Sequence, residues 1–175
     1  MAPPRDAWAA AFAEQARSDW SVYRLLALEP EVARCHALHY LQMACEKIAK
    51  AYRARDTAAE LPDLLGRHVG FAKFVSSFLL SPAVRQEFSG KEAQLSQLRA
   101  AFRHLARGIE KLAPAVDRQD APENAEYPWA RGDEVIAPCR YDYPSLSLLR
   151  EPGGRTFLRL VERALGDFET LRLSR

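Results

Sequence analysis

Apolar residues recur at spacings of three and four along most of the chain, which is the pattern of amphipathic helices. Over residues 4–27 this pattern is carried mainly by large side chains: Trp8, Phe12, Ala16, Trp20, Tyr23 and Leu26. Pro30 begins a second helical segment, which runs to residue 54 without a further Pro or Gly. We therefore expect one long helix in each segment, because nothing local opposes it.

Later segments follow the same pattern. We predict a connection over 56–66, where Pro62 and Gly66 act as breakers, and a third helix over 67–80. A short helix is expected over 83–88, a fourth long helix over 91–112, and a last helix over 155–171. Six of the eleven prolines lie between residues 113 and 154. We therefore predict an irregular strap over 114–154, with a short helical turn at 145–149.

The expected fold is all-α, an up-and-down bundle of four main helices with the strap and a C-terminal helix. With 175 residues and 48% hydrophobic content, the chain can bury one core, so 1–175 is expected to be a single domain. Three cysteines without a CxxC pair favour a reducing, cytoplasmic location. No segment reaches the roughly 18 apolar residues of a membrane span, and the N-terminus does not resemble a signal peptide.

The segment 36–53 has a polar stripe opposite its apolar face. At about 100° per residue, His39, Gln42, Glu46 and Lys50 fall together, away from Leu41, Cys45 and Ile48. Glu46 and Lys50 have the favourable i, i+4 order, which contributes roughly 0.2–0.5 kcal/mol to an exposed helix. This pattern indicates an inner helix of a bundle.

The order of residues in this segment also resembles a known family. The run Tyr40-Leu41-Gln42-Met43-Ala44-Cys45-Glu46-Lys47-Ile48-Ala49-Lys50-Ala51 is similar to the second-helix signature of the HEPN (higher eukaryotes and prokaryotes nucleotide-binding) superfamily. The resemblance is close over about a dozen residues and extends loosely to about residue 113. It implies a helical bundle, a likeness to RNA-associated and dimeric proteins, and association with a nucleotidyltransferase or a toxin–antitoxin or other defence partner.

The fourth segment contains a candidate catalytic motif, Arg99-Ala100-Ala101-Phe102-Arg103-His104. Catalytically active HEPN proteins are metal-independent endoribonucleases with an Arg, four to six residues and then His, so the resemblance makes Arg99 and His104 candidates. Histidine can transfer a proton near neutral pH, and arginine can hold the phosphate and its developing charge. Two positions depart from the pattern of active members, because Ala100 and Ala106 stand where polar residues are frequent.

Helical geometry separates the two candidates. Five helical positions place Arg99 and His104 about 140° apart. Arg103, Arg107 and Lys111 fall between them and complete a basic face. Such a face can bind a nucleic-acid backbone, or it can be an ordinary solvated surface. The net charge of +2 is too small to indicate nucleic-acid binding by itself, so local clustering must support it.

Two further groups were considered as sites. Cys35, His36 and His39 stand close on one helix, but no other ligands complete a metal site, so we predict no metal and no cofactor. In the strap, Tyr127 and Trp129 could stack on bases or anchor a partner, with Asn124 and Glu126 adding hydrogen bonds. Alternatively, the two aromatic residues pin the strap to the bundle.

Three hypotheses remain open from the sequence. The first is a HEPN-like RNA-associated or protein-interaction module, expected to be a homodimer without catalysis of its own. The second is a metal-independent endoribonuclease of toxin type that uses Arg99 and His104. The third is a helical adaptor with a purely structural role. No membrane association is expected under any of them.

Overall fold

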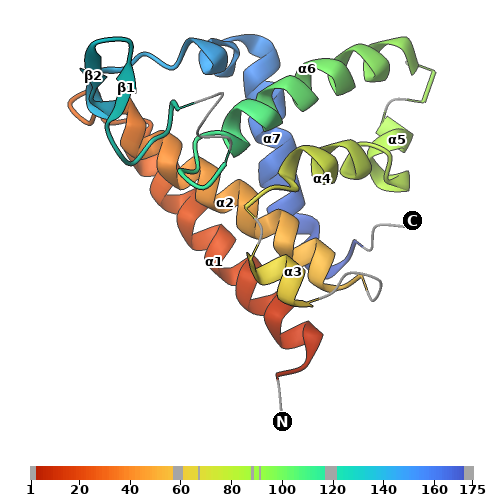
Figure 1. The fold of residues 1–175 in the computed structure, drawn as a ribbon. Coiled ribbons are helices and arrows are strands. Elements are labelled where there is room, and N and C mark those ends of the chain that lie inside the picture. The colour runs from red at the N-terminus through yellow and green to blue at the C-terminus, as the bar shows by residue number, and fades with distance from the viewer. Residues whose placement is uncertain are drawn as a thin grey trace.

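The computed structural model describes residues 3–56, 61–66, 68–87, 89–90, 92–116 and 122–171. This part of the chain is mostly helical, with one small two-stranded sheet (Figure 1). The predicted all-α class therefore holds in its coarser form, a mostly helical chain. No helix of the described residues is long and apolar enough to cross a membrane.

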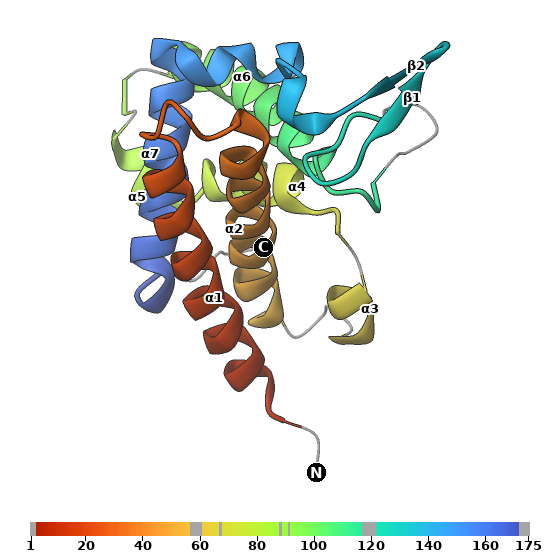
Figure 2. The ribbon, with the colours of Figure 1, turned by 90° about the vertical axis from the view of Figure 1, so that its left-hand side faces the viewer.

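Helices α1 (Arg5–Leu26) and α2 (Arg34–Ala54) form an antiparallel pair, side by side in both ribbon views (Figures 1 and 2). Small buried residues allow the two backbones to approach closely: Ala9, Ala13 and Ala16 on α1, and Ala37, Ala44 and Ala51 on α2. The Lys47 ammonium lies 2.5 Å from the Asp19 carboxylate and joins the helices. The prediction for α1 is accurate to one residue at each end. The predicted start of α2 at Pro30 is wrong, because residues 30–33 form a turn and an extended N-cap.

The middle of the chain contains α3 (Leu61–Gly66), α4 (Phe71–Phe78), α5 (Pro82–Glu87) and α6 (Glu92–Glu110). A connection was predicted where α3 lies; Pro62 is compatible with α3 because the first helical turn needs no amide hydrogen from it. Helix α4 is shorter than the predicted 67–80, because Gly70 has φ 140° and only Phe71 begins the helix. The predicted boundaries at residues 67, 88 and 91 lie outside the described residues.

Helix α7 (Pro152–Gly166) and the 3-10 turn η3 (Asp167–Glu169) replace the predicted helix over 155–171. Gly154 is required in α7, because a Cβ there would lie 2.1 Å from the Leu148 carbonyl oxygen. Helix α7 helps to complete the core, and the Tyr52 hydroxyl donates to the Ala164 carbonyl at 3.0 Å. The core is rich in buried aromatic residues: Tyr52, Phe71, Phe74, Phe78, Phe102, Phe157 and Phe168.

The strap is more regular than predicted. Strands β1 (Trp129–Arg131) and β2 (Glu134–Ile136) form an antiparallel hairpin, which turns at Gly132 with φ 61° and projects from the helices (Figure 2). Two 3-10 helices follow, η1 (Pro138–Arg140) and η2 (Pro144–Arg150), and η2 contains the predicted turn at 145–149. The Arg34 guanidinium donates to the carbonyls of Asp142 (2.5 Å) and Leu146 (3.1 Å). These bonds attach the strap to the beginning of α2.

Candidate functional site

The exposed side of α6 carries the predicted basic residues. Leu95, Phe102 and Ile109 on its inner side are buried, as the helical periodicity requires. Arg103, His104, Arg107 and Lys111 are all exposed, and Arg99 is half-buried. The five residues fan across about 140° of the helix surface. The structure therefore places the predicted basic face at the surface.

The two candidate catalytic residues are not brought together within one chain. Arg99 lines a pocket toward the beginning of α6, where its Nε atom is buried without a hydrogen-bond partner. His104 points from a different part of the same face and is exposed. Among the described residues, no hydrogen bond or ion pair joins them. A single chain therefore does not assemble the proton-transfer group beside the phosphate-binding group.

The three arginines of this face have no acid partner among the described residues. Within the described part of the chain, Arg99, Arg103 and Arg107 have no ion pair, whereas Arg17, Arg24, Arg55 and Arg163 each meet a carboxylate. Glu110 is the one acid in the C-terminal half of α6, and it is engaged elsewhere. Its Oε1 accepts the backbone N–H groups of Gly70 (2.6 Å) and Ala72 (3.0 Å), at the beginning of α4. Arg99, Arg103 and Arg107 therefore form a positive surface without acid partners among the described residues.

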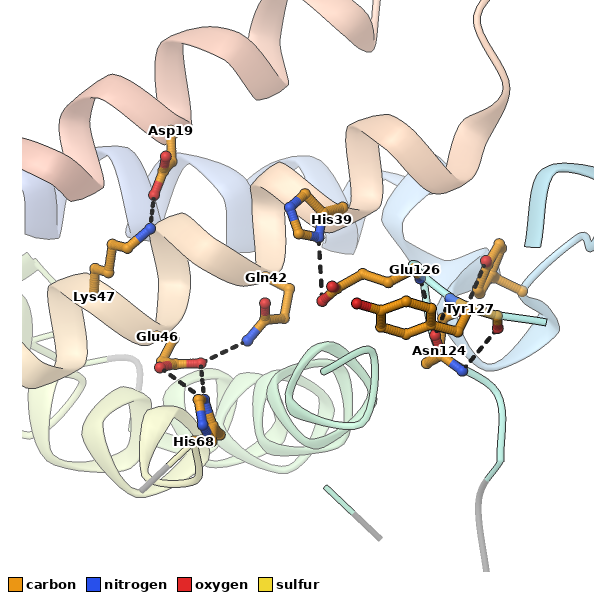
Figure 3. A network of polar contacts seen from close by, with 10 residues as sticks. Asp19, His39, Gln42, Glu46, Lys47, His68, Asn124, Glu126 and Tyr127 are labelled. Carbon is orange, nitrogen blue, oxygen red and sulfur yellow. Dashed lines mark hydrogen bonds and ion pairs between the residues drawn. The ribbon is translucent and has the colours of Figure 1, made fainter. Parts of the chain in front are cut away.

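The polar stripe of α2 has the opposite character (Figure 3). The Gln42 amide donates to Glu46 at 2.8 Å, and the Lys50 ammonium lies 2.8 Å from the same carboxylate. His68, from the segment before α4, reaches Glu46 at 3.2 Å, a contact that the sequence did not predict. Gln42 is only 2% exposed, so this part of the stripe is not a solvated face. The charged groups of this network are therefore paired with one another.

The ionisation of Glu46 reflects this network. Burial acts to raise the pKa of the Glu46 carboxyl. The hydrogen bond and charge of Lys50 outweigh it, helped by the Gln42 amide and by His68. The net pKa is lowered from its ordinary value. Glu46 is thus held as a carboxylate, whereas a general acid would need a raised pKa.

Asn124 builds a tight turn in the strap through hydrogen bonds to the neighbouring backbone. Its Oδ1 accepts the backbone N–H groups of Glu126 (2.9 Å) and Tyr127 (2.7 Å), and its Nδ2 donates to the Tyr127 carbonyl at 3.1 Å. Asn124 is buried and already bonded within the strap, so its amide does not form the hydrogen bonds to a partner that the first alternative for this segment requires. The Glu126 carboxylate lies 3.5 Å from His39 on α2, and the turn presents Tyr127 beside it (Figure 3).

Tyr127 and Trp129 have different environments. Trp129 is 7% exposed and meets Tyr141 edge to face at a centroid distance of 5.1 Å. Tyr143 continues the stack, and its hydroxyl donates to the Asn124 carbonyl at 3.0 Å. For Trp129 the structure therefore supports the second alternative, anchoring of the strap, and not base stacking. Tyr127 is 56% exposed and remains available to a partner.

No group of three or more His, Cys, Asp or Glu side chains in the described ranges could hold a metal ion. Cys35 is buried and Cys139 is exposed, both as free thiols. Burial raises the pKa of the Cys35 thiol, with a smaller contribution from Cys139, so Cys35 is not activated as a nucleophile. The polar contacts of α2 and of Asn124 are internal to the fold, whereas Arg103 and Arg107 on α6 and Tyr127 on the strap are exposed.

Comparison of the chain with protein-family models, curated proteins and solved structures gave no match.

Proposed function

We propose that this protein is an RNA-associated module that binds the sugar–phosphate backbone through the exposed face of α6, without catalysis of its own. The observation that carries the proposal is the absence of acid partners for Arg99, Arg103 and Arg107 in the described structure. Arginine guanidinium groups form strong charge-assisted hydrogen bonds to phosphate. Binding is also favoured because neutralised phosphates release their counterions. With a net charge of only +2, attraction to RNA has to come from this local surface.

The strap supplies a second element at the far end of the face. The Ala125 N–H donates to the Leu112 carbonyl at 3.1 Å, which holds the turn over 124–127 beside the C-terminal end of α6. Tyr127 is exposed there, and an exposed aromatic ring can stack on an unpaired base. In this proposal, an RNA strand bound along α6 contacts the Arg103 and Arg107 guanidinium groups and continues to the Tyr127 ring.

Several broader expectations belong to the same proposal. We place the chain in the HEPN superfamily, with α1, α2, α4 and α6 as the bundle helices, on the resemblance over 40–51. We infer a cytoplasmic, two-fold homodimer in which the α6 helices approach each other. A bound polyanion would offset the repulsion between two basic faces. An acidic antitoxin or a nucleotidyltransferase is the protein partner expected for this surface.

The endoribonuclease alternative has weaker support. Within one chain, Arg99 and His104 diverge around α6, and the residues at 100 and 106 are alanines. Catalysis would therefore need a second chain to supply the missing partner group. Incubation of single-stranded RNA with the purified protein in EDTA tests this directly, and we expect intact RNA. Cleavage that His104→Ala abolishes would overturn the non-catalytic part of the proposal.

The binding test is fluorescence anisotropy with a labelled single-stranded RNA. We expect Arg103→Ala with Arg107→Ala to weaken binding about 30-fold, because two phosphate contacts are lost. Arg155→Ala with Arg159→Ala is the matched control, since it removes the same charge from exposed positions of α7. Equal losses in both double variants would show that net charge, and not the α6 face, determines affinity. Binding that neither variant changes would overturn the proposal.

The contribution of Tyr127 is tested in the same assay. Tyr127→Ala should weaken RNA binding about tenfold, within the range for loss of one stacked base. Tyr127→Phe keeps the ring and should retain most of the affinity. Unfolding curves of both variants should match the wild type, because the side chain is exposed. A larger loss in Tyr127→Phe than in Tyr127→Ala would contradict stacking.

A further inference from the structure

A pocket of about 660 Å³ lies where the C-terminal end of α4, helix α5 and the beginning of α6 come together. Its position adjoins the basic face, because Arg99 belongs to both. Helix α5 contributes Arg85, and the turn after α5 contributes Ser89. The sequence pattern did not predict this pocket, because its walls come from three separate elements.

The charged groups of the pocket are predominantly positive. Neither Arg85 nor Arg99 forms an ion pair with any described residue, so two guanidinium groups face the pocket without compensation. The acid in the lining is Glu92, whose Oε1 accepts the Gly90 N–H at 3.1 Å. That bond directs the carboxylate into the turn before α6. The pocket therefore favours an anion.

Two of the buried polar atoms that lack a hydrogen-bond partner in the described residues belong to Arg99 in the pocket and to Ser81, which adjoins the pocket in the chain. In the described ranges, four side-chain polar atoms are buried without a hydrogen-bond partner: Trp20 Nε1, Ser81 Oγ, Arg99 Nε and Trp129 Nε1. Arg99 lines the pocket, and Ser81 lies between two lining residues, Leu80 and Pro82. Buried donors of this kind are normally satisfied in a native structure. Because Nε itself is covered, an oxyanion in the pocket would meet the terminal nitrogens of the Arg99 guanidinium, which are not among these buried atoms.

The remaining walls indicate what the anion is attached to. The hydroxyls of Ser89 and Ser96 can donate to further oxygens of the same group. Leu80 and Leu95 add apolar surface to the lining, which suits an organic ligand more than bare phosphate. A phosphate monoester carries close to two negative charges at neutral pH, which matches two guanidinium groups. A carboxylate or an internal phosphodiester carries one.

We propose that this pocket binds a phosphate monoester through Arg85 and Arg99. The monoester has two possible sources, the terminal phosphate of an RNA strand that lies along α6 and the phosphate of a free nucleoside monophosphate. The lining of the pocket by itself supports the binding of a phosphate monoester. That this monoester is the end of an RNA strand rests on the proposed function. In the RNA case, the end of the strand occupies the pocket and the chain continues past Arg103.

The experiment compares matched ligands on the full chain. Anisotropy is measured with one RNA oligonucleotide carrying a 5′-phosphate, a 3′-phosphate or hydroxyls at both ends. Isothermal titration uses adenosine monophosphate, with adenosine as the control. We expect a terminal phosphate to increase RNA affinity about tenfold, the size of one charge-assisted contact, and adenosine monophosphate to bind where adenosine does not.

Variants separate this pocket from the α6 face. Arg85→Ala should reduce the affinity ratio between phosphorylated and hydroxyl-ended RNA to about one, and it should remove binding of adenosine monophosphate. Arg99→Lys keeps the positive charge but removes the planar guanidinium group, which can donate two parallel hydrogen bonds. It should therefore lower the affinity ratio between phosphorylated and hydroxyl-ended RNA only in part. Arg103→Ala with Arg107→Ala should weaken both RNAs by the same factor and leave the ratio unchanged.

Each outcome has a defined meaning. A phosphate-dependent ratio without binding of adenosine monophosphate assigns the pocket to RNA ends. Binding of adenosine monophosphate that depends on Arg85, without an effect of RNA phosphorylation, assigns it to free nucleotides and leaves the RNA proposal to its own test. Equal affinity for phosphorylated and hydroxyl-ended RNA, together with no binding of adenosine monophosphate, would overturn the pocket proposal. Monoester binding that Arg85→Ala leaves intact would also overturn it.

Discussion

Helices α2 and α6 are of similar length, 21 and 19 residues, and each has one apolar and one polar side. Their polar sides differ in how charge is balanced. On α2, Glu46 meets Lys50 and His68, and Lys47 meets Asp19. On α6, the described structure gives Arg103 and Arg107 no counter-charge. The charges of α2, which support the fold, neutralise one another, whereas Arg103 and Arg107 on α6, which we propose bind RNA, have no partner among the described residues that does so.

The largest effect is expected from breaking a buried pair on α2. Lys47→Ala leaves the Asp19 carboxylate, whose side chain is 7% exposed, with only its hydrogen bond from Gln15. We expect the free energy of unfolding in urea to fall by about 3 kcal/mol, since an uncompensated charge then remains buried. Lys73→Ala, at an exposed position of α4, is the control and should change stability by less than about 0.5 kcal/mol. A loss as small as that of the control would contradict the structural role assigned to the α2 charges.

The second effect concerns the salt dependence of RNA binding by the α6 face. Each phosphate neutralised on a single strand contributes about 0.7 to the slope of log affinity against log salt. Arg103→Ala with Arg107→Ala should therefore reduce the magnitude of that slope by about 1.4. Anisotropy titrations at four or more salt concentrations measure it. An unchanged slope would mean that these two residues do not contact phosphates.

A third prediction uses the ionisation of Glu46. Because its pKa is lowered in the folded state, the Glu46 carboxylate contributes stability above the ordinary glutamate pKa, and this contribution is lost as the pH falls through the folded-state value. Glu46→Gln should lower the free energy of unfolding by about 1 kcal/mol at neutral pH. The difference from the wild type should shrink on acidification. A difference that grows toward low pH would show the opposite shift.

The smallest effect is expected on the stability of α6. His104→Ala removes an exposed side chain without a described partner, so the free energy of unfolding should stay within about 0.5 kcal/mol of the wild type. Thermal or urea unfolding checks this value. A loss above about 1 kcal/mol would mean that the α6 face supports the fold, and the contrast with α2 would fail.

The sequence predicted the long helices because each buries a regular apolar side, and the periodicity of α1, α2, α6 and α7 follows from that burial. It missed α3, because Pro62 and Gly66 were interpreted as breakers although they stand at the two ends of a helix. It also missed the hairpin, whose strands have three residues each. Gly132-Asp133 between short runs was the available signal.

In the candidate site, the basic face of α6 and the polar contacts of α2 also differ in how far the sequence predicts them. The basic face was predictable, because exposure around one helix follows from its apolar side. The contacts of Glu46 with His68 and of His39 with Glu126 were not, since they join segments 22 and 87 residues apart whose approach depends on the tertiary fold. The pocket at Arg85 and Arg99 has the same origin. Sequence periodicity describes one element at a time, and sites formed between elements lie beyond it.

The contacts between the end of α2 and the C-terminal segment also have a consequence for how the chain folds. The Tyr52 hydroxyl reaches the Ala164 carbonyl, and the Arg55 guanidinium donates to the Phe168 carbonyl, across more than a hundred residues. Local pairing of α1 with α2 can form early, but these distant contacts close late. A nascent chain that has not yet emerged past residue 168 therefore leaves uncovered the part of Tyr52 that packs against Phe168. During synthesis, that apolar surface is open to aggregation or chaperone capture.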